Sequence, residues 1–352
     1  MGPSATIQHI RHIASQGLPA KMAVAAMVDA LEPLIPTRTK IFFWVGEDSS
    51  PSDFYEAEPL MSALDAYFCQ AEALARDPNA PSFDKLANSP VEYGGWRRFE
   101  HFDGWERSVL KNEVFGAYNI GNNLDFTIRD GGKPVGVLAI AREPGTSSYA
   151  RSDIDTVLAL RGHFLHAMNA GQVLEKAAGA EGACDGPAIA LVGSDGTVVQ
   201  AGPQAALLLH QLATPQPKMR LTGRPAPEPV REAMRRLRAI EEGHGTLAAS
   251  LDVMTGWGRI RVIAHSRCPS GEAIVSLQRF VPRALCRIHR SAGLDLSPRE
   301  REVAVAMCGT GDGDAIARHL GLSSASYREY ARRIYRRLGV EGRMAIKDLL
   351  DS

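Results

Sequence analysis

The chain has 352 residues, enough for two or three domains. Its 45% hydrophobic and 23% charged content is ordinary for a globular protein, and 40 basic side chains balance 40 acidic ones. This balance excludes a uniformly basic nucleic-acid coat, although one basic segment could still bind phosphates. The sequence has neither a signal-peptide pattern nor an apolar run of about 18 residues, so we expect a cytoplasmic protein outside the membrane.

The segment 1–176 begins with alternating helix and strand patterns. An apolar stripe predicts a helix over Leu18–Leu34, which Pro36 ends. Residues Thr39–Val45 are rich in β-formers and predict a strand. A second helix is expected over Ala57–Arg76.

A β-hairpin and a long helix follow in the same segment. Residues 124–130 and 134–143 flank a Gly-Gly-Lys turn, and a Ser/Asp cap starts a helix over 152–175. The hairpin GKPVGVLAIAR with the helix SDIDTVLAL resembles a GAF domain. The resemblance implies an α/β sensor module over residues 1–176.

Aromatic side chains concentrate just before this hairpin, between positions 93 and 118. An aromatic wall with a few polar groups suits a small, flat ligand. The alternative is that these rings fill the core beneath a long loop. The predicted ligand-binding residues are Tyr93, Trp96, Phe99, His101, Trp105, Phe115 and Tyr118.

Residues 187–282 predict a second α/β module. Two strands surround an Asp-Gly turn at 195–196, and a short helix and a basic helix, Val230–Glu242, follow. Three more strands are expected at about 246–254, 259–267 and 272–280. The order resembles a PAS domain, which implies a transmitter and dimerisation module. Residues 283–292 are predicted as a linker.

The segment 293–352 contains the start and stop signals of several short helices, as expected for a compact helical domain. Ser297 suits an N-cap, Pro298 the first helical position and Glu300 the third residue of a capping box. A second helix is expected over Asp314–Leu320, ending at Gly321, where a left-handed residue is favoured. The next residues start a third helix, which predicts a helix-turn-helix.

The third helix, 324–338, combines an apolar and a basic face. Five arginines against one glutamate give it a formal charge of +4 in a chain whose total is zero. A short helix of this kind fits the DNA major groove. The apolar positions are Tyr327, Tyr330 or Ala331, Ile334 and Leu338; the arginines are Arg328, Arg332, Arg333, Arg336 and Arg337.

These residues carry a family resemblance. The runs LSPREREV, AIARHLGLS and RRIYRRLGV, with Arg343, resemble the LuxR/GerE-type helix-turn-helix, and the resemblance covers the segment 293–352. The family's usual Val and His in the recognition helix are here Tyr327 and Tyr330. These departures bear on the DNA target more than on the fold.

The resemblance implies roles for individual residues. Base contacts are expected from Arg328, Glu329 and Arg332, since arginine reads guanine and glutamate can accept from cytosine. A fourth helix over 342–350 is expected to serve packing or dimerisation. Phosphate contacts are expected from Ser323, Ser324, Arg333, Arg336 and Lys347.

The whole sequence thus predicts a multidomain α+β protein, with GAF-like and PAS-like modules before a four-helix LuxR-type domain. We expect a dimeric one-component transcription regulator that binds double-stranded DNA and a small effector in the N-terminal module, with aromatic molecules among the candidates. The alternative is a ligand-independent regulator controlled by a protein partner or by constitutive dimerisation. The length and tryptophan pattern before the helical domain do not match acyl-homoserine-lactone receptors.

We expect neither an enzyme nor a bound metal or cofactor. The sequence contains no nucleophile elbow, no P-loop, no His-Glu-x-x-His motif and no zinc-ligand spacing. The cysteines are odd in number and far apart, so we expect reduced and mostly buried thiols. They lie at positions 69, 184, 268, 286 and 308.

Overall fold

The protein is described by a computed structural model that covers most of the chain in two compact units. The two-sheet unit contains Ile35–Leu165 and Asp185–Arg279. The helical unit contains Met1–Leu34, His166–Cys184 and Phe280–Ser352. The described residues are 3–57, 61–76, 83–90, 93–94, 107–170, 181–183, 186–213, 223–245, 247–267 and 271–351.

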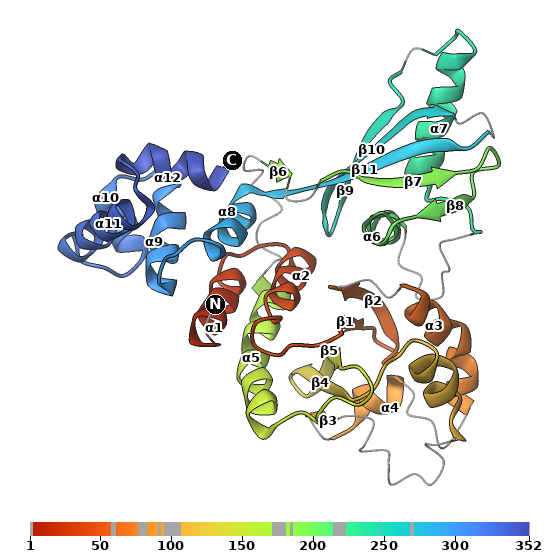
Figure 1. Ribbon diagram of the computed structural model, residues 1–352, viewed down its shortest axis with the longest axis horizontal. Helices are drawn as coiled ribbons and strands as arrows, with labels where there is room; N and C mark the ends of the chain where they lie inside the picture. The colour runs from red at the N-terminus through yellow and green to blue at the C-terminus, as the bar shows by residue number, and fades with distance from the viewer. Residues whose placement is uncertain are drawn as a thin grey trace. The chain divides into compact units, whose positions relative to one another are not determined.

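The two-sheet unit opens with a five-stranded antiparallel sheet in the order β2-β1-β5-β4-β3 (Figure 1). The predicted first strand and hairpin are confirmed, and the hairpin turn pairs Asp130 with Lys133. The edge strand β2 was not predicted, because its Pro and Asp are poor strand formers. The strands are β1 (Thr39–Val45), β2 (Pro51–Glu56), β3 (Tyr93–Gly94), β4 (Asn123–Asp130) and β5 (Lys133–Ala141).

Apolar side chains cover both faces of the first sheet. On one face, Phe42 stacks on Phe164 of α5 (Arg151–Ala170) at a ring-centroid distance of 5.7 Å. A Cβ on Gly136 would lie 2.5 Å from the Phe42 ring, so glycine is needed there. The other face carries α3 (Met61–Arg76), α4 (Phe83–Asn88) and the π-helical turn η3 (Leu110–Gly116).

The second sheet has the strand order β8-β7-β11-β10-β9, and β6 pairs with the end of β11. A single core forms between this sheet and its two helices, α6 and α7 (Figure 1). The predicted strands and helices of this module are confirmed to within a few residues. They are β7 (Ala188–Val192), β8 (Val198–Ala201), α6 (Pro203–Leu212), α7 (Glu228–Glu241), β9 (Ser250–Thr255), β10 (Gly258–Arg267) and β11 (Ala273–Pro282). The short strand β6 (Glu181–Ala183) was not predicted.

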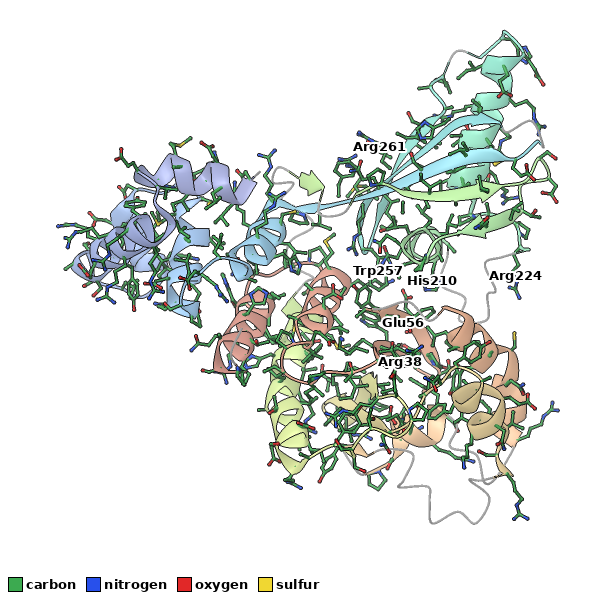
Figure 2. The ribbon with its side chains drawn as sticks, in the orientation of Figure 1. Arg38, Glu56, His210, Arg224, Trp257 and Arg261 are labelled. Atoms are coloured by element: carbon green, nitrogen blue, oxygen red, sulfur yellow. The ribbon has the colours of Figure 1, made fainter. Side chains whose placement is uncertain are left out.

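Buried contacts join the two sheets of this unit. Trp257, in the turn between β9 and β10, packs edge-on against Trp44 of β1 at a ring-centroid distance of 5.3 Å. On α6, Nε2 of His210 lies 3.3 Å from Oδ1 of Asp53, and the imidazole stacks on Phe54. Figure 2 labels His210 and Trp257, which lie between the two sheets. The sheets are therefore linked through β1 and β2, of which β1 also lines the cavity described below.

The helical unit contains seven helices among its described residues. The segment 283–292, predicted as a linker, is a helix that packs on α9 and α12. The helix predicted over residues 324–338 is confirmed at the same bounds. The helices are α1 (Pro3–Ala14), α2 (Ala20–Asp29), α8 (Arg283–Ala292), α9 (Pro298–Met307), α10 (Gly313–His319), α11 (Ser324–Leu338) and α12 (Gly342–Asp351).

Two predicted helix bounds were wrong. The helix expected over Leu18–Leu34 ends at Asp29, because the ring of Pro33 would clash with the carbonyl of residue 29. The helix expected from Ala57 was placed too early, since strand β2 extends to Glu56 and the described helix is Met61–Arg76. The N-terminal helix α1 was not predicted.

Gly321, at the turn between α10 and α11, is expected to contribute to the stability of the protein. Gly321 has a φ of +63°, so Gly321→Ala is expected to destabilise the protein by about 1–2 kcal/mol. Gly162, exposed within α5 and with no atom within 4 Å of an added Cβ, is the matched control. Gly162→Ala should stabilise by up to about 1 kcal/mol. Urea unfolding followed by circular dichroism tests both, and equal effects would contradict the role of the turn.

Candidate functional sites

Helices α10 and α11 form a helix-turn-helix whose ends are capped locally. The Asp312 side chain accepts from the Ala315 amide at the start of α10, and the Ser323 hydroxyl accepts from the Ser326 amide at the start of α11. Ser324 Oγ donates to Asp314 Oδ1 at 2.6 Å, which ties the two helices together. These bonds fix the first turn of α11 relative to α10.

The first helix of this segment is held by the predicted capping box. The Ser297 side chain accepts from the Glu300 amide, and the Glu300 carboxylate accepts from the Ser297 amide. Glu300 also accepts from Arg337 at 3.1 Å. Burial opposes ionisation of Glu300, but these bonds and the guanidinium hold its pKa below the ordinary value. Arg337 therefore joins α11 to α9, although the pattern had placed it on the open basic face.

The opposite face of α11 is open and cationic. Ala331 and Ile334 are buried against the other helices, whereas Tyr327, Tyr330 and Leu338 are half-buried. A Cβ on Gly313 would lie 3.0 Å from the Tyr327 ring, so this glycine makes room for the larger side chain. The exposed arginines on this face are Arg328, Arg332, Arg333 and Arg336, whereas Arg337 is exposed but pairs with Glu300 of α9.

The three residues predicted to contact bases lie along one stretch of α11. Arg328 is exposed, and the Arg332 side chain is 76% exposed. Glu329 bridges two arginines, accepting from Arg332 at 2.9 Å and from Arg333 at 3.1 Å. In this state Glu329 holds the arginine heads in place, so it would have to exchange these partners in order to accept from a base.

The residues predicted to contact phosphates are distributed over α11 and α12. Ser323 and Ser324 are occupied by the capping and interhelical bonds described above. Arg333 and Arg336 are exposed on α11, whereas Lys347 is half-buried on α12. Their roles stay a prediction.

Arginines that do not face outward hold the remaining helices of this unit. Arg343 donates to the carbonyls of Met307, Gly309 and Gly311, which closes the carbonyl end of α9. Arg287 of α8 donates through two nitrogens to the Asp351 carboxylate at the end of α12, at 2.6 and 2.7 Å. The arginines of these helices therefore divide into half-buried residues that join helix ends and an exposed group on α11.

A second candidate site is a cavity of about 700 Å³, counting the part open to solvent, in the two-sheet unit. It lies between the sheet formed by β1, β4 and β5 and the helices α3, α4 and η3. Its walls are almost entirely apolar. The apolar lining includes Ile41, Phe43, Leu64, Phe83, Val114, Phe115, Val137 and Ile140.

Four polar side chains reach this apolar cavity: Thr39, Tyr67, Asn123 and Asp125. The Asp125 side chain is 2% exposed, and its Oδ2 accepts from Asn123 Nδ2 at 2.9 Å. Burial, with the nearby charges of Asp125 and Asp84, raises the pKa of Tyr67 well above its ordinary value. Tyr67 is therefore a neutral hydrogen-bonding group beside a buried carboxyl.

The structure places the predicted ligand-binding residues in different ways. Phe115 lines the cavity. Tyr93 lies on β3, where it stacks on Phe126 and its hydroxyl accepts from Arg151. Tyr118 is half-buried just after η3. Trp96, Phe99, His101 and Trp105 lie outside the described residues.

The polar lining of the cavity was missed by sequence reasoning. One signal was present: in the strand LDFTIRD, Asp125 and Thr127 alternate with Leu124 and Phe126, and both sets are buried. A carboxylate within a strand that is buried on both faces requires a polar partner or a ligand. The pattern was interpreted as an ordinary half-buried hairpin strand, so Asp125 was not singled out.

Within the described ranges, no group of three or more His, Cys, Asp or Glu side chains could hold a metal ion. No helix among those residues is long and apolar enough to cross a membrane. Of the cysteines in the same ranges, Cys286 and Cys308 are buried and Cys69 is exposed, all as free thiols. Cys184 and Cys268 lie outside the described residues.

No protein-family model matches the chain, and a search of curated proteins found no match. Solved structures with partial similarity include the N-acylhomoserine lactone-dependent LuxR family transcription factor CepR2 from Burkholderia cenocepacia (12% identity, 49% of this chain and 93% of that one, TM-score 0.31). Escherichia coli SdiA matches at 11% identity over 93% of this chain and 88% of that one, with a TM-score of 0.32. The E. coli DhaR(N)–DhaL complex matches at 14% identity over 74% and 86%, with a TM-score of 0.25. TM-scores this low carry no functional argument.

Proposed function

We propose that the protein is a DNA-binding transcription regulator whose recognition helix is α11. The observation that carries this proposal is the exposed arginine face of α11, held by a capped turn against α10 in a chain of zero net charge. Such a helix matches the width and charge of the major groove. In this proposal Arg328, Glu329 and Arg332 contact bases. Ser323, Ser324, Arg333, Arg336 and Lys347 contact phosphates.

The regulator is proposed to act as a homodimer on a twofold DNA site. Helix α12 supports this part of the proposal, because Met344 is 64% exposed while Ile346 and Leu350 are fully buried. An exposed apolar side chain on a short helix is a contact that a second copy could cover. The PAS-like sheet is a second place where copies could meet.

The cavity in the two-sheet unit is proposed as the effector site. Its apolar walls suit a hydrocarbon or aromatic body, and the Asp125 carboxyl suits an N–H or O–H donor on that body. Phe43 lines the cavity and Phe54 packs on it, at a ring-centroid distance of 6.3 Å. Phe54 in turn stacks on His210 of α6, so a ligand could shift the packing between the two sheets.

Capture of genomic DNA fragments by the purified full chain tests the proposed function. Enrichment of one sequence with twofold symmetry is the expected result. Failure to enrich any sequence at low salt, both with and without a cell extract of small molecules, would contradict DNA binding. The genes beside an enriched site would then point to the effector.

The effector site has its own test, which does not depend on DNA binding. Native mass spectrometry of protein purified from its own cells should detect a retained small molecule. Ala139 lines the cavity, so Ala139→Phe should fill the space and remove that mass almost completely. The matched control is Ala150→Phe, which adds the same ring at an exposed position and should leave the mass in place.

A regulator without a ligand is the alternative, controlled by a protein partner or by constitutive dimerisation. It would be favoured if native mass spectrometry detected no retained molecule and the empty protein bound its DNA site with full affinity. The cavity favours the ligand-responsive form, since a largely apolar lining with a few polar groups is typical of small-molecule sites.

A further inference from the structure

The N-terminal helix α1 is built into the helical unit. Although α1 lies at the start of the sequence and α8 begins only at Arg283, α1 packs on α8 and on α9. Ile10 and Ile13 have no exposed surface, and Thr6 is 1% exposed. A 12-residue helix would be marginal alone, so this apolar contact holds it.

The interface between α1, α8 and α9 is unusual because basic groups gather in it. His9 of α1 is 8% exposed, and its ring meets the ring of His289 of α8 edge-on, with centroids 6.4 Å apart. The charges of His12 on α1 and Arg301 on α9 also act on His9, and the charge of Glu302 on α9 acts on His12. Basic groups therefore outnumber the carboxylate whose charge acts on the two histidines of α1.

Arg301 adds to the excess of basic groups at this interface. Its Nη2 donates to the Leu294 carbonyl at 3.1 Å, whereas its Nε and Nη1 are buried without a hydrogen-bond partner in the described structure. Burial lowers the pKa of Arg301, and the charge of Asp295 opposes that shift. A permanent charge in this position makes a second buried charge costly. The interface can therefore form readily only while its histidines are neutral.

We propose that α1 is an acid-released clasp on α8 and α9: it stays docked while His9 and His12 are neutral and leaves the helical unit when they are protonated. The inference concerns the contact alone and does not depend on DNA binding. Release would expose Ile10 and Ile13 and the parts of α8 and α9 on which α1 packs.

The direction of the pH effect follows from linkage. Burial, followed by the charges of His289, His12 and Arg301, lowers the pKa of His9 from 6.5 to about 4 in the docked helix. Burial also lowers the pKa of His12, and Glu302 opposes that shift. A lowered histidine pKa gives docking its full strength above pH 6.5 and weakens it as pH falls toward 4. From His9 alone, docking should be about tenfold weaker at pH 5.5 than at pH 7.5.

Hydrogen exchange of the full chain, corrected for intrinsic rates, measures the docking equilibrium directly. The expected result is a loss of protection of about tenfold or more in α1 between pH 7.5 and pH 5.5. Amides of β1 and β5 serve as internal references. Unchanged protection of α1 across this range would overturn the proposal.

Two substitutions separate the histidines from general acid sensitivity. His9→Phe keeps a ring against His289 but cannot be protonated, so α1 should lose about tenfold less protection on acidification than in the wild type. The matched control is His244→Gln, because His244 is 68% exposed and lies in the two-sheet unit. It should behave as the wild type.

A third variant covers the case in which His9→Phe fails to fold. Ile13→Glu places a charge at a fully buried position of α1 and should undock the helix already at pH 7.5. Equal acid sensitivity of the wild type and His9→Phe would overturn the role of the histidines. Retained protection of α1 in Ile13→Glu would overturn the docking itself.

Discussion

The double substitution Arg328→Ala/Arg332→Ala should weaken specific DNA binding by about 30-fold or more. One bidentate arginine–guanine contact contributes about 1–3 kcal/mol of discrimination, and two such contacts would be lost. Both side chains are exposed and neither holds the fold, so the free energy of unfolding should change little. Titration of a labelled site identified by fragment capture, at a fixed salt concentration, measures the effect.

Helix α7 offers a control of the same spacing and charge. Arg231 and Arg235 are exposed and four residues apart, and each pairs with Glu228. The substitution Arg231→Ala/Arg235→Ala also removes two positive charges and should leave specific DNA affinity within about twofold, because the proposed base contacts come from α11 alone. If both double variants weakened binding alike, α11 would not be the recognition helix.

Phe164→Ala should destabilise the two-sheet unit by about 3–5 kcal/mol. Phe164 is 1% exposed and lies parallel to Phe42, with 9° between the rings. Removing the ring loses its transfer free energy and leaves a cavity against a sheet that cannot close over it. Urea unfolding followed by tryptophan fluorescence measures this loss, since Trp44 contacts the same Phe42 ring.

An exposed apolar residue gives the comparison. Met254 of β9 is 70% exposed, so Met254→Ala should change the free energy of unfolding by less than about 0.5 kcal/mol. A loss below about 1 kcal/mol for Phe164→Ala would mean that the ring pair does not anchor α5 to the sheet. The packing behind the proposed effector cavity would then have to be assigned to other contacts.

Local signals explain why the C-terminal helices could be predicted. Ser297, Pro298 and Glu300 predict the start of a helix within a single turn. Gly321 predicts the turn that ends a helix, because glycine tolerates a positive φ. The same applies to the hairpin of β4 and β5, whose turn residues are adjacent in sequence. Such signals act over short distances along the chain, so one sequence is sufficient to detect them.

Long-range packing explains what could not be predicted. The cavity combines Tyr67 of α3 with Asp125 of β4, and helix α1 meets α8 across almost the whole chain. No short pattern encodes either pairing. The predicted ligand residues show the same limit, since clustering of aromatics in sequence placed Phe115 at the cavity but Tyr93 against Phe126.

The contact of α1 with α8 and α9 also has a consequence during synthesis. A ribosome adds about 5–20 residues per second, so α1 would emerge roughly 14–56 seconds before its partners. During that interval the buried face of α1, with Ile10 and Ile13, has no α8 or α9 to cover it. The two-sheet unit can fold during that interval, whereas the helical unit can complete its folding only after α8 and α9 have been synthesised. Slow translation of the middle of the chain should therefore increase the demand for chaperones that hold α1.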